Sequence, residues 1–119
     1  MNVNDKLMSL EAFTGLKVQP DIHTGEDDNY ITFNYAAEGV ELASDDEPEA
    51  DTATIYVNLY TEPGFNYMKT KEIIKNYLES LDWCNLYNIF TTTEEYKTNA
   101  NVVKQKRHTV FELEITQWR

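Results

Sequence analysis

The sequence has one cysteine, Cys84, so the chain cannot form an internal disulfide bond. The segment around Cys84 has no catalytic signature, and we expect this residue to serve as a small buried apolar side chain. Long apolar runs are also missing, and no apolar stretch typical of a secretion signal stands near the N-terminus. These absences predict synthesis in a reducing, cytosolic compartment and no membrane span.

Basic residues are scarce, with 10 Lys and Arg against 21 Asp and Glu, for a formal charge of -11. Nucleic-acid-binding surfaces normally carry a basic patch, and anionic lipid attracts basic segments, so this balance argues against both partners. No basic residue stands between Lys17 and Lys69, whereas Lys104, Lys106 and Arg107 cluster later. This asymmetry predicts either head-to-tail packing between subunits or two ordinary solvated surfaces.

The sequence offers few converging groups for catalysis. Its two histidines, His23 and His108, have no second ligand at metal-binding spacing. A Gly-x-Ser-x-Gly nucleophile elbow is absent, and the four glycines are too scattered for a phosphate-binding loop. We therefore predict that the chain is not an enzyme and needs no cofactor.

The acidic segment 45–51 suggests a calcium site, because calcium prefers six to eight oxygen ligands. The spacing of an EF-hand is missing, however, and Pro48 favours an extended or hairpin-tip conformation. We expect a solvated or partner-facing loop here and no metal. The carboxylates of the segment are those of Asp45, Asp46, Glu47, Glu49 and Asp51.

The 119 residues are enough for one domain, 1–119, with one core. Apolar spacing of three and four predicts helices over 2–14 and 66–82, with a cap at Asn66 and a stop at Gly15. Alternating patterns predict strands over 30–35, 52–61, 86–92 and 108–117. Between them we expect a loop at 15–29, an acidic excursion at 36–51 and a polar loop at 94–103. The pattern predicts an α+β fold, with a mixed or antiparallel sheet of four or five strands packed against two helices.

The strands have two unlike faces. The residues expected to point inward are Ile31, Phe33, Tyr35, Ile55, Val57, Leu59, Phe111, Leu113 and Ile115. The opposite face combines tyrosine with small polar residues, at Thr54, Tyr56, Asn58 and Tyr60 beside Tyr30, Thr32 and Asn34. Tyrosine is enriched at protein interfaces because it has a large apolar area and a polar end. We interpret this face either as a binding surface or as a face half-covered by a loop.

Four segments resemble the small tail-terminator, or tail-completion, proteins of long-tailed bacteriophages and Gram-positive prophages. They are YITFNY (30–35), LASDDEPEADTATIYVNLYT (42–61), FNYMKTKEIIKNYL (65–78) and KRHTVFELEI (106–115). The resemblance covers most of the chain from residue 30 onward, and it is one of pattern, without a catalytic signature.

The resemblance implies an α+β subunit that joins copies of itself in a ring, commonly a hexamer, on the last ring of the tail tube. The ring stops polymerisation of the tail tube protein and gives the head–tail connector protein a surface to join. We therefore expect a virion tail protein made in the bacterial host cytoplasm. Two alternatives remain: another head–tail connector or adaptor component, and a small ligand- or peptide-binding module using Tyr56 and Tyr60. The residues we assign to the interface are Asp45, Asp46, Glu47, Glu49, Asp51, Tyr56, Tyr60, Lys104, Lys106 and Arg107.

Overall fold

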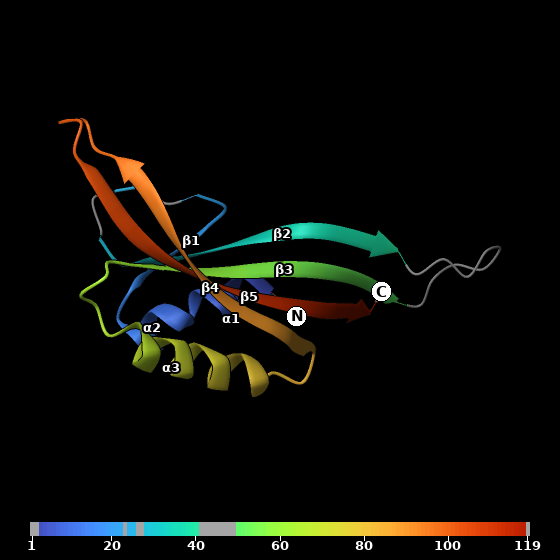
Figure 1. Ribbon diagram of the computed structural model, residues 1–119. Helices are drawn as coiled ribbons and strands as arrows, with labels where there is room; N and C mark the ends of the chain where they lie inside the picture. The colour runs from blue at the N-terminus through green and yellow to red at the C-terminus, as the bar shows by residue number, and fades with distance from the viewer. Residues whose placement is uncertain (1–2, 23, 26–27, 41–49, 119) are drawn as a thin grey trace.

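The computed structural model describes residues 3–22, 24–25, 28–40 and 50–118, with the backbone alone at 36–40, 50–52 and 116–118. Helices and strands follow each other in an α+β order, which confirms the predicted fold class (Figure 1). The elements are α1 (Val3–Met8), α2 (Leu10–Thr14), β1 (Lys17–Pro20), β2 (Tyr30–Val40), β3 (Ala50–Thr61), α3 (Tyr67–Glu79), β4 (Cys84–Lys97) and β5 (Val103–Trp118).

The five strands form one mixed sheet in the order β1-β2-β3-β5-β4. β1 runs parallel to β2, and all other neighbouring strands are antiparallel. The register of the central strands places Val57 of β3 opposite both Phe33 of β2 and Phe111 of β5. The three helices lie on one side of this sheet (Figure 1).

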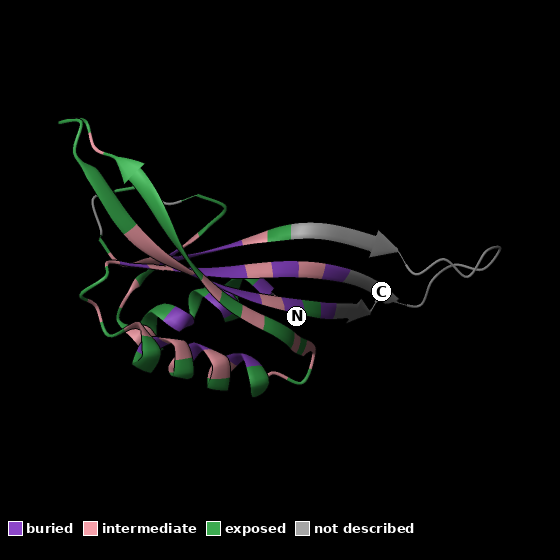
Figure 2. Ribbon diagram, viewed as in Figure 1, coloured by how far each residue is buried: buried purple, intermediate pink, exposed green. Residues whose placement is uncertain are grey.

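The core lies between the sheet and the helices (Figure 2). The odd-numbered residues of β3 and β5 supply its sheet side, and they are fully buried at Ile55, Val57, Leu59, Phe111, Leu113 and Ile115. Leu7, Leu10, Ile74 and Leu78 cover them from the helices. Burying each of these large apolar side chains contributes about 1.5–3 kcal/mol. The inward residues predicted from alternation are confirmed, except that Tyr35 is 40% exposed.

The predicted cap at Asn66 and stop at Gly15 are found, but α3 ends at Glu79 instead of residue 82, and the first helix is broken. Gly15 ends α2 in the left-handed conformation with φ 73°, and the Asn66 side chain accepts a hydrogen bond from Lys69 N at 3.5 Å. Between α1 and α2, the Ser9 hydroxyl donates to the carbonyl of Asp5 at 3.0 Å. A serine hydroxyl bonded back to the fourth preceding carbonyl tends to bend a helix.

Two predicted loops are wrong. Part of 15–29 forms β1, which we missed because four residues with one buried side chain, Val18, give no visible alternation. The segment 94–103 is mostly strand, because β4 continues to Lys97 and β5 begins at Val103. These ends form a hairpin that projects past the body of the domain (Figure 1). Both of its faces meet solvent, so it lacks the apolar alternation of a half-buried strand.

The connection between β2 and β3 is also shorter than expected. We predicted that the excursion begins at residue 36, but β2 pairs with β3 as far as Val40, opposite Asp51. A register shift between Tyr35 and Ala37 lets pairing continue past the end of the apolar alternation.

Candidate functional site on the open face of the sheet

Among the described elements, all helices lie on one side of the sheet, and the other side is uncovered (Figure 1). We call this side the open face. Even-numbered residues of β2, β3 and β5 form its centre, because successive side chains of a strand point to opposite faces. Tyr30 stands opposite Tyr60, and His108 also stands opposite Tyr60. No helix or strand in the described ranges therefore covers the tyrosine-rich face expected from the sequence.

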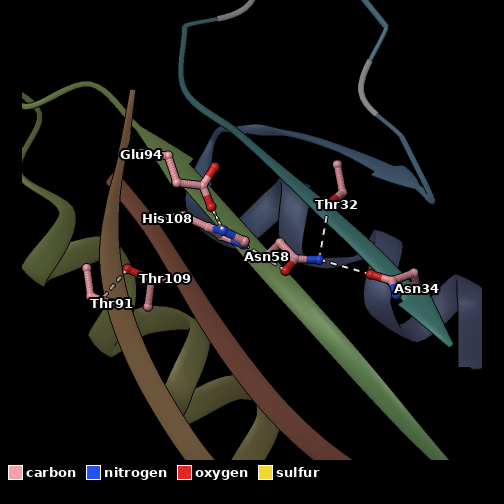
Figure 3. A network of polar contacts seen from close by, with 7 residues as sticks. All are labelled: Thr32, Asn34, Asn58, Thr91, Glu94, His108 and Thr109. Atoms are coloured by element: carbon pink, nitrogen blue, oxygen red, sulfur yellow. Dashed lines mark hydrogen bonds and ion pairs between the residues drawn. The ribbon is translucent and has the colours of Figure 1, made fainter. Parts of the chain in front are cut away.

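Asn58 joins three strands at the centre of the open face (Figure 3). Its side-chain amide donates to Thr32 Oγ1 at 3.3 Å and to Asn34 Oδ1 at 3.1 Å. The remaining oxygen, Oδ1, lies 2.9 Å from His108 Nε2. Because both amide hydrogens already have acceptors, Oδ1 accepts and His108 Nε2 donates. Asn58 is only 7% exposed, so these bonds satisfy a nearly buried amide.

The other nitrogen of His108 contacts an acidic residue of the hairpin. Nδ1 lies 2.7 Å from Glu94 Oε1 (Figure 3). An ionised carboxylate has no proton to donate, so Nδ1 is the donor in this bond. Both ring nitrogens of His108 therefore have an oxygen partner, Asn58 Oδ1 at Nε2 and Glu94 Oε1 at Nδ1. His108 therefore links the start of the hairpin to the middle of the sheet.

Aromatic rings continue from His108 as a stacked column. The His108 ring lies over Tyr60 with centroids 4.2 Å apart, and Tyr60 lies over Tyr30 at 5.0 Å. The ammonium of Lys106 stands 4.7 Å from the Tyr30 ring centroid and 5.6 Å from that of Tyr96. These are cation–π distances, so the column is held at both ends.

Burial raises the pKa of Tyr30 and of Tyr60 above the usual 10.0, and the negative charge of Glu94 adds to both shifts. Both phenols therefore keep their protons at neutral pH. The column presents hydroxyl groups that donate and accept hydrogen bonds, and it presents no phenolate nucleophile.

A cavity of about 220 Å³ opens where the column meets the hairpin. It is lined by Tyr30, Tyr60, Glu94, Glu95, Tyr96 and Lys106. Small-molecule sites usually measure about 300–1,000 Å³. This cavity therefore suits one side chain of a partner better than a whole ligand.

The structure separates the interface residues predicted from sequence. Tyr56 and Tyr60 lie on the open face, with Lys106 at its border. Arg107 points to the opposite side, where its guanidinium lies 4.2 Å from the Tyr67 ring centroid. Lys104 is exposed in the hairpin, so the three basic residues do not form a single patch.

Most acidic residues of the predicted interface lie outside the residues that the structure describes. The backbone of Asp51 pairs with Val40 and with Gln117 at the end of β3. The other predicted acidic positions, and the calcium hypothesis with them, lie outside the described residues: Asp45, Asp46, Glu47 and Glu49.

Sequence reasoning missed the roles of His108 and Glu94. The two residues stand 14 positions apart and meet only because β4 pairs with β5. One signal was present in the sequence. His108 is an even-numbered residue of β5 and therefore lies on the open face, whereas the odd-numbered Phe111 lies on the core side.

In the part of the chain that the structure describes, no three His, Cys, Asp or Glu side chains gather as a metal site. None of its helices has the length and apolar character that a membrane crossing requires. No protein-family model matches the chain, and no curated protein matches its sequence.

Proposed function

We propose that this chain is a tail-terminator-like structural protein of a long-tailed phage or prophage. In this proposal, copies of the chain form a ring on the end of the tail tube, stop its growth and present a surface to the head connector. The single observation that carries the proposal is the pre-arranged column of Tyr30, Tyr60 and His108 on an uncovered sheet face. The sequence resemblance supplies the identity of the assembly.

The chemistry of the open face favours binding protein over catalysis. Both nitrogens of His108 already have partners, so the ring is not poised as a general base toward the cavity. Tyrosine rings supply contact area at a low entropic cost and are enriched among interface residues that dominate binding. Because the column is held by Asn58 and Lys106, little ordering remains when a partner binds.

A ring also requires two different surfaces on each subunit, because head-to-tail contacts are heterologous. The open face supplies one surface, and the projecting hairpin, where Lys104 is exposed, supplies a second. By charge, the acidic segment 45–51 is the partner we assign to Lys104. Reversing the charge of Lys104 should weaken ring assembly, and more so at low salt.

The direct test is the length of tubes assembled from the cognate tail tube protein, measured by negative-stain electron microscopy with and without this chain. We expect shortened or fixed lengths with added density at one end. Tyr60→Ala should lose this effect, whereas Asn76→Ala on the exposed side of α3 should keep it. Circular dichroism would confirm that Tyr60→Ala folds. Unchanged lengths without end density would refute the terminator assignment, and binding to a connector ring instead would support the connector alternative.

The cavity favours a second candidate, a peptide-binding module. Its size and its mixture of tyrosine rings, carboxylates and one ammonium suit a single polar or aromatic side chain. A thermal-shift screen of short peptides would test this, because a ligand that binds only the folded state raises the melting temperature. A hit that Tyr60→Ala abolishes would support the module. If no peptide raises the melting temperature at millimolar concentration, the result would count against the module.

A further inference from the structure

β4 forms one border of the sheet. Its 14 residues pair with β5 along one side. The strand order ends at β4, and no strand in the described ranges pairs with its outer side. Such an edge has a row of backbone N–H and C=O groups with no strand to bond them, which makes it a template for pairing with another chain.

The border at the opposite side of the sheet is protected. β1 has only four residues and ends at Pro20, which has no backbone N–H to donate. The backbone N–H of Val18 in β1 donates to Glu11 Oε1 of α2 at 3.2 Å. A short strand, a proline and a covering side chain are the usual ways to block an edge. The β1 edge is therefore blocked against pairing with another chain, unlike the β4 edge.

The protective features of β4 stand only at its ends. A register shift between Leu86 and Asn88 interrupts its first part, and Glu94, Glu95 and Lys97 place charges along its last part. Between them, residues 89–93 (IFTTT) contain no charge, proline or glycine. Phe90 in this stretch is 41% exposed on the open face. Residues 89–93 therefore form an unprotected segment with high β-propensity.

We propose that residues 88–94 pair antiparallel with the same residues of a second copy of this chain. A two-fold axis at Thr91 would relate the copies and join their sheets into one continuous sheet. Thr91 would stand opposite Thr91 of the other copy, and Phe90 opposite Thr92. The two Phe90 rings would be diagonal neighbours, within reach of each other across the junction.

The charges of β4 favour this arrangement over a parallel one. In the proposed register, Glu94 faces the uncharged Asn88 of the other copy, so no like charges stand opposite each other within residues 88–94. A parallel pairing in register would set Glu94 against Glu94 and Glu95 against Glu95, which is destabilising. The bond of Glu94 to His108 also draws that carboxylate toward β5 and away from the edge.

The pairing does not depend on the proposed function, because it concerns the isolated chain. It has a characteristic salt dependence. Each copy has a formal charge of -11, so two copies repel each other at long range. Salt screens that repulsion but has little effect on backbone hydrogen bonds and the contact between the Phe90 rings. The dimer should therefore strengthen with added salt, whereas a contact held by opposite charges would weaken.

Sedimentation velocity of the full chain over a concentration series, at about 0.05 M and about 0.5 M salt, tests the association. We expect a monomer–dimer equilibrium with at least a several-fold larger association constant at the higher salt. Thr92→Lys would place a charge on the edge, next to Phe90 of the other copy, and should abolish the dimer. Asn76→Lys adds the same charge on the outer side of α3 and should leave the dimer intact. A chain that stays monomeric at every concentration, or a dimer that Thr92→Lys does not affect, would overturn the proposal.

Cysteine cross-linking in a Cys84→Ala background tests the register. The axis would set the two Thr91 Cα atoms about 4.5–5.5 Å apart, within the range of a disulfide. Thr91→Cys should therefore give a covalent dimer on mild oxidation. The two Thr93 Cα atoms would be about 14 Å apart, so Thr93→Cys should stay uncross-linked. Equal cross-linking at both positions, or at Thr93 alone, would refute the register.

Discussion

Asn58 on β3 and His108 on β5 are 50 residues apart in sequence, yet the amide oxygen of one lies 2.9 Å from Nε2 of the other. This bond connects a network of polar side chains on β2 and β3 with the stacked aromatic column and the hairpin. On one side of it lie the hydroxyl of Thr32 and the amide of Asn34, and on the other lie Glu94 and the stacked Tyr60. The open face is therefore ordered before any partner arrives.

Removing the amide of Asn58 should destabilise the fold. Asn58→Ala leaves His108 Nε2 without its acceptor and removes two further bonds from a nearly buried position. We expect a loss of about 2 kcal/mol in the free energy of unfolding, measured by urea denaturation. Asn76→Ala on the exposed side of α3 should change it by less than about 0.5 kcal/mol. Equal effects of the two changes would show that the network contributes nothing.

The bond between His108 and Glu94 should contribute much less to stability. The Glu94 side chain is 53% exposed, and water and salt screen such pairs, which typically contribute about 0–1 kcal/mol. Glu94→Gln keeps an oxygen acceptor and should cost less than about 1 kcal/mol. The difference from the wild type should shrink at high salt in the same denaturation assay. A loss as large as that of Asn58→Ala would contradict this view of the pair.

Thr61 has a buried hydroxyl that finds no hydrogen-bond partner among the described residues. Replacing it with valine keeps the shape and removes a polar group buried at a cost. We expect Thr61→Val to be neutral or to stabilise the chain by up to about 1 kcal/mol. Thr109 is the matched control, because its hydroxyl pairs with Thr91 Oγ1 at 3.0 Å. Thr109→Val should destabilise by about 1 kcal/mol in the same thermal or urea measurement. If both variants lose stability equally, Thr61 has a partner in solution.

Cys84 should react slowly in the folded chain. Burial raises the pKa of its thiol from 9.0 to about 11, so near pH 8 the reactive thiolate is about a hundredfold scarcer than in an unfolded chain. A thiol-specific chromogenic reagent should therefore modify the native protein about a hundredfold more slowly than the urea-unfolded protein. Equal rates would mean that Cys84 is open to solvent.

Stability should fall at alkaline pH. The folded chain holds the protons of Cys84, Tyr30 and Tyr60 more tightly than the unfolded chain does, because all three pKa values are raised. The stabilisation is complete below about pH 9, where both states are protonated, and is lost as the pH rises toward about 11 and beyond. Melting temperatures measured across this range should drop, and Cys84→Ala should reduce the drop. Melting temperatures that stay constant across this range would contradict the raised pKa values of these three groups.

Much of this fold was predictable because one side of the sheet is apolar and buried against the helices. Ile55, Val57 and Leu59 alternate with polar residues, and the helix over 67–79 has a clear cap at Asn66. β1 and the hairpin were not predictable in the same way. β1 is too short for a pattern, and the hairpin has solvent on both faces, so no alternation of apolar and polar residues marks it.

The site was predictable only in part. Tyr56 and Tyr60 stand in the same strand, β3, so their common face follows from their spacing. The contact between His108 and Glu94 depends on the register of β4 against β5, which a turn at 98–102 sets. Asn101 occupies a left-handed conformation in this turn, with φ 62°. No local pattern encodes that long-range pairing.

The alternation along β3 and β5 also bears on how such a chain can evolve. Substitutions at the odd-numbered positions of these strands disturb the core, whereas many at the even-numbered positions change only what the molecule shows to the outside. Tyr56 and Tyr60 belong to this second group, whereas Asn58 and Val110 are even-numbered residues that are buried. A lineage of such proteins can therefore acquire new binding partners by drift at alternate residues, provided that Asn58 and its three hydrogen bonds are retained.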